Sequence, residues 1–420
     1  MLPSSSVRPD YDGYCLSNVS VTALSLLGLT GLGRRLPDDA LGSAEVSGLE
    51  NVVLMLFDGL GYAEWKRQGT HGLFGALSRK GNVRPITTVF PSTTAAALTS
   101  VSTGLTPQEH GLPEWYVYMR EVGEVIVTLP FSRAGDSRRD TLRGVMAPRA
   151  LFDGRTVFER LKDKGMKGTS LTTRSLARSV YSRAANRGGK VVPYASASDL
   201  AVSLRRLVED SRGQNLYYVY WPYVDTLEHI YGPGTEEAGI EASIISHALL
   251  EGFLAKLSRN AAEKTFIMAT ADHGQVGVKP EETLYLNRLR RLVNALDVTP
   301  SGKTMPPWGS ARDLYMKVRD DMLGDVESYL AQKLAGIASV LKTEDAVRDG
   351  LFGVGEPSRK FLRRVGNLMV LPHDAKTVWF RYRKGDSLWL KGHHGGLTED
   401  EMTVPLASGR ASELRKWRYP

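Results

Sequence analysis

The sequence predicts an α/β fold in which a mostly parallel central sheet is covered by helices on both faces. Three continuous apolar runs have the length of a strand, and each ends abruptly in polar residues: "NVVLMLF" (51–57), "NLYYVYW" (215–221) and "KTFIMAT" (264–270). Such runs are typical of strands buried on both faces of a parallel sheet. Segments with helical spacing of apolar residues, at 156–165, 198–211 and 236–258, alternate with them. Strand and helix in alternation is the pattern of βαβ units.

The remaining segments complete this layout. Residues 18–29 have the apolar spacing of a short helix that stops at Gly28, and the glycines of 28–33 then predict a loop, because no strand precedes them. The less regular region from about 276 to 388 predicts a smaller subdomain inserted into one catalytic domain that spans residues 1–420.

Composition restricts the chemistry and the location. The chain has 420 residues and one cysteine, Cys15, so any metal must be held by histidines and carboxylates. The net charge of +8 favours anionic partners without naming one. The N-terminus lacks the layout of a secretory signal and no apolar run is long enough for a membrane span, so we expect a cytoplasmic protein without membrane association.

Acidic residues and histidines follow the three apolar strands. Asp58 follows the first, Asp225 and His229 follow the second, and Asp272 and His273 follow the third. In open α/β sheets, ligands bind outside the carboxyl ends of the strands, so these side chains are expected to converge on one crevice. The paired histidines of "GHHGG" (392–396) are a fourth candidate.

Each of these patterns alone has an ordinary structural explanation. An Asp-Gly pair is a common turn, and two residues four apart on a helix, such as Asp225 and His229, can be a simple surface pair. His393 and His394 can be ordinary loop residues. The repetition of one ending on three strands favours a functional site.

The residue types indicate a divalent metal. Asp225, His229 and one of the two adjacent histidines would form one three-ligand site, and Asp58, Asp272 and His273 would form another. Three protein ligands leave positions open for substrate, as catalytic sites do.

A segment rich in hydroxyl groups can lie between two such metals. In "TTVFPSTTAAALTSVSTG" (87–104), Ser92, Thr93 and Thr94 precede an alanine-rich helix. A hydroxyl at this position is commonly an N-cap. The same position also offers free backbone N–H groups to a phosphate, and a metal there would activate the hydroxyl as a nucleophile.

Five motifs in this order resemble the alkaline phosphatase superfamily, and within it the type I phosphodiesterase / nucleotide pyrophosphatase family. They are "LMLFDGLG", "VFPSTTAAALTSVSTG", "DTLEHIYGP", "TADHG" and "HGGLTEDEMTVPL", which extend from Leu54 to Leu406. The resemblance implies an alkaline phosphatase-like fold and two divalent ions, zinc first and manganese as the alternative. It also implies a small phosphoester substrate, with a nucleotide as one candidate, and hydrolysis of phosphodiester or pyrophosphate bonds through a phosphothreonine.

The resemblance also assigns roles to individual residues. Thr94 would be the nucleophile and would bind one metal, because it precedes Gly104 by the family's spacing of ten residues. His394 would be a ligand in preference to His393, because it directly precedes the two glycines. The implied ligand sets are Asp225, His229 and His394 for one metal, and Asp58, Asp272 and His273 for the other.

The chain departs from the family at one position. Where nucleotide pyrophosphatases carry an asparagine that binds a phosphate oxygen, "HGLPEWYVYM" has Trp115. Trp115 and Tyr116 are therefore candidates for an aromatic wall that binds substrate, or for residues of a hairpin.

Two other functions are compatible with these residues. A phosphomonoesterase, phosphonate hydrolase or phosphomutase would use the same dimetal core. A nucleic-acid-binding protein would use the basic segments 174–190 and 358–364, where Arg174/Arg178 and Arg183/Arg187 have the spacing of one helical face. A solvated basic surface is the ordinary explanation for these segments, so nucleic acid is not the expected partner.

Overall fold

A seven-stranded sheet forms the centre of the computed structural model, which describes residues 2–43, 46–383 and 385–417. The strand order is β2-β18-β9-β1-β8-β6-β7, and all strands run parallel except β18, which lies antiparallel between β2 and β9. The strands are β1 (Asn51–Phe57), β2 (Asn82–Thr87), β6 (Lys167–Thr173), β7 (Lys190–Tyr194), β8 (Asn215–Trp221), β9 (Thr265–Thr270) and β18 (Thr403–Arg410). The predicted α/β fold with a mostly parallel sheet is confirmed.

The three predicted apolar strands are neighbours at the centre of the sheet. β1 pairs with β8 on one side and with β9 on the other, so that Leu54 lies opposite both Tyr218 and Met268. Every residue of β1 and β9 is buried. Their continuous apolar character follows from this position, because both faces of a central strand are covered.

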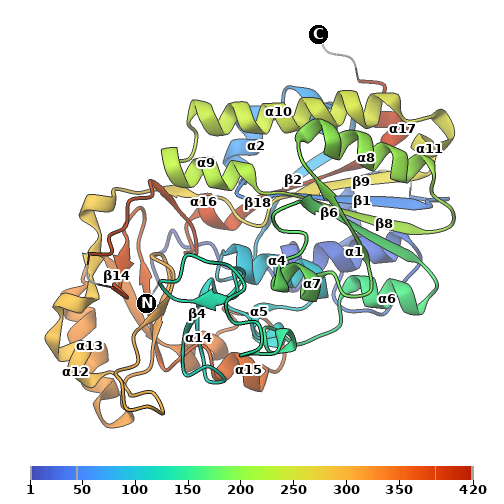
Figure 1. Ribbon diagram of the computed structural model, residues 1–420. Helices are drawn as coiled ribbons and strands as arrows, with labels where there is room; N and C mark the ends of the chain where they lie inside the picture. The colour runs from blue at the N-terminus through green and yellow to red at the C-terminus, as the bar shows by residue number, and fades with distance from the viewer. Residues whose placement is uncertain (1, 44–45, 384, 418–420) are drawn as a thin grey trace.

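Helices cover both faces of the sheet, as predicted. Figure 1 shows α8 and α10 on one face and α1, α4 and α6 on the other. The helices of this part are α1 (Val19–Leu26), α2 (Tyr62–Gln68), α3 (Gly72–Lys80), α4 (Thr94–Thr103), α5 (Pro107–His110), α6 (Val157–Asp163), α7 (Val180–Ala185), α8 (Ala197–Glu209), α9 (Tyr223–Tyr231), α10 (Glu236–Gly252), α11 (Arg259–Glu263), α16 (Glu399–Met402) and α17 (Ala411–Leu414). The predicted loop at 28–33 contains no helix or strand.

One helical stretch in the described chain, Glu236–Lys256, is long and apolar enough to cross a membrane by length and composition alone. Half of its most apolar window is buried inside the protein, where α10 contacts α8, α3 and α9. Packing within the fold accounts for this apolar character, so the stretch is weak evidence for a membrane span.

Smaller elements lie beside the main sheet. In Figure 1, α12, α13 and β14 form a group to one side of it. A four-stranded sheet of order β12-β13-β15-β14 has its own buried cluster, which includes Leu314, Val326 and Val370. The elements between residues 276 and 393 are β10 (Val276–Gly277), β11 (Leu284–Tyr285), α12 (Arg290–Ala295), β12 (Trp308–Gly309), β13 (Leu314–Met316), α13 (Leu323–Lys333), β14 (Ala338–Lys342), α14 (Thr343–Arg348), α15 (Arg359–Leu362), β15 (Leu368–Pro372), β16 (Val378–Trp379) and β17 (Gly392–His393). The boundaries 276 and 388 of the inserted subdomain stay a prediction.

Candidate active site

The carboxyl ends of the three central strands bring the predicted polar residues together. Asp58 directly follows β1, and Asp272 and His273 follow β9. Asp225 and His229 lie on α9, which starts at Tyr223 after the end of β8. His394 comes from the segment after β17, far along the chain.

Asp225, His229 and His394 form the first group of potential metal ligands. One ligand atom from each lies within 4.8 Å of the others. Nε2 of His229 is 3.3 Å from Oδ1 of Asp225, and Nε2 of His394 is 3.7 Å from the same oxygen. Nδ1 of His229 lies 2.7 Å from the carbonyl oxygen of Gly392, and Nδ1 of His394 lies 2.9 Å from that of Ser92. A hydrogen bond from Nδ1–H to a carbonyl leaves the Nε2 lone pair free for a metal.

Asp58, Asp225 and His273 form the second group, again with atoms within 4.8 Å of one another. Asp272, which the sequence analysis placed here, lies beside it, with Oδ2 3.4 Å from Nε2 of His273. Oδ1 of Asp272 accepts hydrogen bonds of 3.1 Å from the N–H groups of Gly59 and His273. Asp225 belongs to both groups. The two groups are also in contact through the rings of His273 and His394, which stack with centroids 3.6 Å apart.

The electrostatics of the buried groups fit a bound cation. Oδ1 of Asp58 and Oδ2 of Asp272 are buried and have no hydrogen-bond partner among the described residues. Burial, reinforced by the charges of Asp272 and Asp225, raises the pKa of Asp58 well above its usual value. Burial and the neighbouring imidazoles lower the pKa of His394 well below its usual value. Neutral imidazoles beside carboxylates that lack a partner are a donor set suited to a divalent ion.

Thr93 and Thr94 have different surroundings at the start of α4. Thr93 is the N-cap, and its hydroxyl accepts a hydrogen bond of 3.4 Å from the N–H of Ala96. Thr94 is the first helical residue, and its Oγ1 lies 3.0 Å from Nε2 of His273. Ser92 stabilises residues 392–396, which we call the histidine loop. Its hydroxyl donates a hydrogen bond to the carbonyl of Gly396 and accepts one from the N–H of Gly395.

Gly274 is required by lack of space. A Cβ at Gly274 would lie 2.1 Å from the carbonyl oxygen of Asp400 and 3.0 Å from Cα of Gly61. Gly59, which follows Asp58, is constrained in two ways. Its φ is 75°, which favours glycine, and a Cβ there would lie 2.7 Å from Cα of Asp225.

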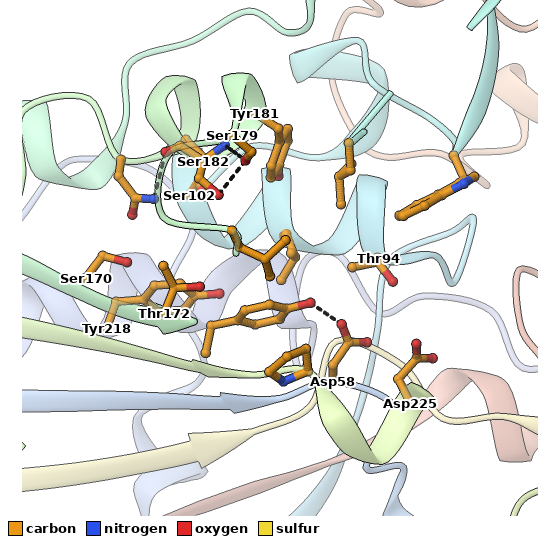
Figure 2. Close-up of a pocket in the computed structure, with 18 of the residues that line it drawn as sticks. Asp58, Thr94, Ser102, Ser170, Thr172, Ser179, Tyr181, Ser182, Tyr218 and Asp225 are labelled. Carbon is orange, nitrogen blue, oxygen red and sulfur yellow. Dashed lines mark hydrogen bonds between the residues drawn. The ribbon is translucent and has the colours of Figure 1, made fainter. Parts of the chain in front are cut away.

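A cavity of about 210 Å³ opens beside Thr94 and is lined by Asp58, Asp225 and Trp115 at that end. Figure 2 shows Asp58, Thr94 and Asp225 together at one end, with Ser170 and Tyr218 at the other. Trp115 is thus placed where it can touch a substrate. Tyr116 does not line the cavity; its ring packs 5.5 Å from Trp379 and 5.4 Å from Tyr382. Tyr116 opens β3 (Tyr116–Met119), which forms a hairpin with β4 (Glu124–Val127), followed by β5 (Ser132–Arg133).

Several residues of the site carried no recognisable signal in the sequence. The hydroxyl of Tyr220 donates to Oδ2 of Asp58, although Tyr220 lies within an apolar run. The amide of Gln275 donates to Oδ1 of Asp225 at 2.6 Å. Arg312 and Glu401 form a fully buried ion pair beneath the histidine loop.

The basic segments do not form the predicted helical faces. The helix α7 begins at Val180 and ends at Ala185, so Arg174 and Arg178 both lie outside it, and Arg187 follows it. Arg187 pairs with Glu159 at 3.2 Å. The prediction that each arginine pair shares one helical face is therefore wrong, because turns occupy 174–178 and the helix that contains Arg183 ends before Arg187.

Comparison with known proteins identifies the relatives of this chain. A search of curated protein sequences gave no match. Inactive murine ectonucleotide pyrophosphatase / phosphodiesterase 5 in complex with AMP matches with a TM-score of 0.62 and 16% identity, over 87% of this chain and 92% of that one. The human protein of the same name matches with a TM-score of 0.60 and 17% identity, over 87% of this chain and 92% of that one. Phosphonoacetate hydrolase from Sinorhizobium meliloti 1021 in complex with phosphonoformate matches with a TM-score of 0.60 and 19% identity, over 86% of this chain and 93% of that one. At these identities the likeness shows the fold.

The family itself is shown by sequence. The profile of the type I phosphodiesterase / nucleotide pyrophosphatase family matches residues 52–397, which is most of the chain and contains every predicted ligand. The chain therefore belongs to this family of hydrolases, within the alkaline phosphatase superfamily.

Proposed function

We propose that this protein hydrolyses small phosphodiesters or pyrophosphates, nucleotide-type esters among them, with Thr94 as the nucleophile. The observation that carries the proposal is the separation of 3.0 Å between Oγ1 of Thr94 and Nε2 of His273. This contact brings a buried hydroxyl at a helix N-terminus to the edge of a group of potential metal ligands.

Two divalent cations would be held by Asp225, His229 and His394 on one side and by Asp58, Asp272 and His273 on the other. Asp225 is close enough to both groups to contribute to each. Zinc is proposed because histidine and carboxylate ligands suit it, and manganese is the alternative. When bound, such ions lower the pKa of the attacking hydroxyl and offset the charge on the leaving oxygen.

Thr94 would form the covalent intermediate. Its Oγ1 bonds to phosphorus as the bond from phosphorus to the leaving oxygen breaks, which leaves phosphothreonine and a free alcohol or phosphate. Attack by water on the same phosphorus then releases the second product and restores the hydroxyl.

The start of α4 can replace the missing phosphate donor. Trp115 occupies the position where the family carries asparagine and has no amide to offer. Within the described residues, no hydrogen bond from the N–H groups of Thr94 and Ala95 to an acceptor is seen, while the N–H of Ala96 is bound by Thr93. These first-turn groups are available for a phosphate oxygen.

The structural relatives support both this function and one alternative. The inactive murine phosphodiesterase carries a threonine-to-alanine replacement and binds AMP. The phosphonoacetate hydrolase binds phosphonoformate on the same fold, which keeps phosphonate hydrolysis as the second candidate. Phosphomonoester hydrolysis and phosphoryl transfer within one molecule are further reactions of such a core.

Turnover of bis-4-nitrophenyl phosphate and 4-nitrophenyl phosphate, measured with the metal content of the same sample, tests the proposal. Preference for the diester with about two metals per chain supports it. Preference for the monoester, or turnover of phosphonoacetate alone, assigns the chain to an alternative. A metal-free protein that stays inactive after reconstitution contradicts the mechanism.

A direct search for the intermediate complements the kinetics. Acid quenching during turnover, followed by mass spectrometry of the peptide that contains Thr94, should reveal a phosphorylated threonine. Cytoplasmic location also remains a proposal and is tested by cell fractionation.

A further inference from the structure

The cavity beside Thr94 extends inward along one face of α4. Thr94, Leu98 and Ser102 line it, and their spacing of four residues places them on the same side of the helix. At 1.5 Å per residue, Ser102 lies about 12 Å along the helix axis from Thr94. The cavity, of about 210 Å³, is far larger than the roughly 10–15 Å³ that one water molecule needs. It can therefore hold an organic group attached to the phosphate.

Hydroxyl groups line the inner end of this cavity. Ser170 and Thr172 alternate along β6 and face it together, while Tyr218 on β8 pairs in register with Ser170. Figure 2 shows these three side chains on the side of the cavity away from Thr94, with Ser102 and Ser182 above them.

Among the residues that the structure describes, two of these hydroxyls make no hydrogen bond. Oγ of Ser170 is buried and without a hydrogen bond among the described residues, in a side chain that is 1% exposed. Thr172 is 4% exposed, and within the described chain no hydrogen bond of its hydroxyl is seen. A buried hydroxyl that lacks a partner costs about 1–3 kcal/mol, so the Ser170 hydroxyl is expected to bind a ligand or ordered water, and the Thr172 hydroxyl beside it is available to the same ligand.

The distribution of charge restricts the group that would enter. The charged side chains of the lining are Asp58 and Asp225, both at the Thr94 end, and Arg139, which is exposed. A charged group at the inner end would be desolvated without a counter-ion, and an apolar chain would leave the hydroxyls unpaired. An uncharged group with several hydroxyls of its own satisfies both conditions.

From these observations, and on the basis of the proposed function, we infer that the substrate is a phosphodiester of a compact polyol, such as a sugar or cyclitol, whose hydroxyls bind Ser170, Thr172 and Tyr218. The polyol would lie along α4 while its phosphate lies at Thr94. This assigns substrate specificity to the inner surface of β6 and β8.

The test compares 4-nitrophenyl phosphodiesters that share one leaving group. The second ester group is methyl, myo-inositol, thymidine or hexyl, and kcat/KM is measured for each with the metal-loaded enzyme. We expect kcat/KM for the inositol diester to exceed that for the methyl diester by at least about tenfold, which corresponds to one or two hydrogen bonds. In Thr172→Val this ratio should fall by about 2- to 12-fold.

Thr169→Val is the matched control. Thr169 lies on the same strand, is 8% exposed, and does not line the cavity, so its replacement should leave the ratio unchanged. An equal fall in both variants would overturn the assignment of Thr172. Equal rates on the methyl and inositol diesters, or a preference for the thymidine or hexyl ester, would overturn the polyol inference.

Binding to Thr94→Ala separates this inference from the proposed function. Calorimetry with inositol 1-phosphate and methyl phosphate should show tighter binding of the former. If none of the diesters is hydrolysed, the proposed function fails, and the binding comparison alone then decides whether the cavity recognises a polyol. Equal binding of the two phosphates would contradict the inference.

Discussion

Oγ1 of Thr94 lies 3.0 Å from Nε2 of His273, which joins the first turn of α4 to the end of β9. The hydroxyl of the neighbouring Thr93 instead caps the helix. Two adjacent threonines thus have different surroundings, and the proposed function gives Thr94 a role in the chemistry while Thr93 caps the helix.

Replacement of Thr94 by alanine should abolish turnover while the protein keeps its fold and its metals. The nucleophile is lost, so we expect kcat to fall by at least about a thousandfold, as for other enzymes that lose a covalent nucleophile. The measurement is kcat on bis-4-nitrophenyl phosphate, together with metal content and thermal unfolding. Thr93→Ala is the control and should lower the free energy of unfolding by about 0.5–2 kcal/mol through loss of the N-cap. If Thr93→Ala lost turnover to the same extent as Thr94→Ala, the two roles would not be separable and the assignment of Thr94 as the nucleophile would be contradicted.

The sequence predicted the ends of the central strands well and the surroundings of the candidate metal ligands poorly. Asp58, Asp272 and His273 follow strands buried on both faces, and continuous apolar runs mark such strands clearly. Tyr220 and Gln275 reach the carboxylates only through the arrangement of β8 and the loop after β9, which spacing along the chain does not encode.

Strand β6 shows why part of the fold was missed. Its sequence "KGTSLTT" has no apolar run, although six of its seven residues are buried. Ser170 and Thr172 line the cavity beside α4, so these two buried positions of the strand carry hydroxyl groups in place of the apolar side chains that predict a strand. The place of Asp225 in both groups of potential ligands was also missed, because only the folded chain brings it to Asp58 and His273.

Removal of one metal ligand should remove one metal. In His229→Ala the group formed with Asp225 and His394 loses a ligand, so bound metal should fall from about two to about one per chain. Metal analysis after dialysis against a weak chelator measures this. His247→Ala, on α10, removes a histidine elsewhere and should keep both metals. Unchanged metal content in His229→Ala would exclude this residue as a ligand.

The same variant should respond differently to added metal. A ligand that binds only the folded state raises the melting temperature in proportion to its binding free energy. Chelated wild type should therefore be stabilised by zinc more strongly than chelated His229→Ala. An equal rise in both proteins would mean that zinc acts outside this group.

The buried pair of Arg312 and Glu401 should matter for stability and for the histidine loop. Both side chains are 0% exposed, and two hydrogen bonds of 2.9 Å join them. Glu401 also accepts the N–H of Gly396 through its side chain and that of Gly274 through its carbonyl. Loss of one partner leaves a buried charge uncompensated, so Glu401→Gln should lower the free energy of unfolding by about 3–5 kcal/mol.

An exposed ion pair supplies the comparison for this variant. Glu413 pairs with Lys416 at 2.7 Å, with side chains 57% and 63% exposed, and Glu413→Gln should cost less than about 1 kcal/mol. The double variant Arg312→Met/Glu401→Met removes both charges and should recover part of the loss. Chemical denaturation of the four proteins measures the effect, and equal costs for the buried and exposed pairs would contradict it.

His110 should make stability depend on pH below the usual histidine range. The imidazole is fully buried, Nδ1 accepts the N–H of Leu112 at 3.1 Å, and Nε2 lies 3.1 Å from Oγ of Ser100 on α4. Burial, reinforced by the charge of Arg364, lowers its pKa to about 3. In the unfolded chain the pKa is about 6.5, so between these values the unfolded state binds the extra proton. The stability from neutral His110 is therefore complete above about pH 6.5 and is lost progressively as pH falls toward 3, by up to about 1.4 kcal/mol per pH unit.

His110→Gln keeps a donor and an acceptor but cannot titrate, so its free energy of unfolding should fall less steeply than that of wild type between about pH 4.5 and 6. Ser100→Ala removes a hydrogen-bond partner and keeps the imidazole, so it should be less stable at every pH with the steep slope retained; equal slopes for wild type and His110→Gln would show that other groups cause the loss.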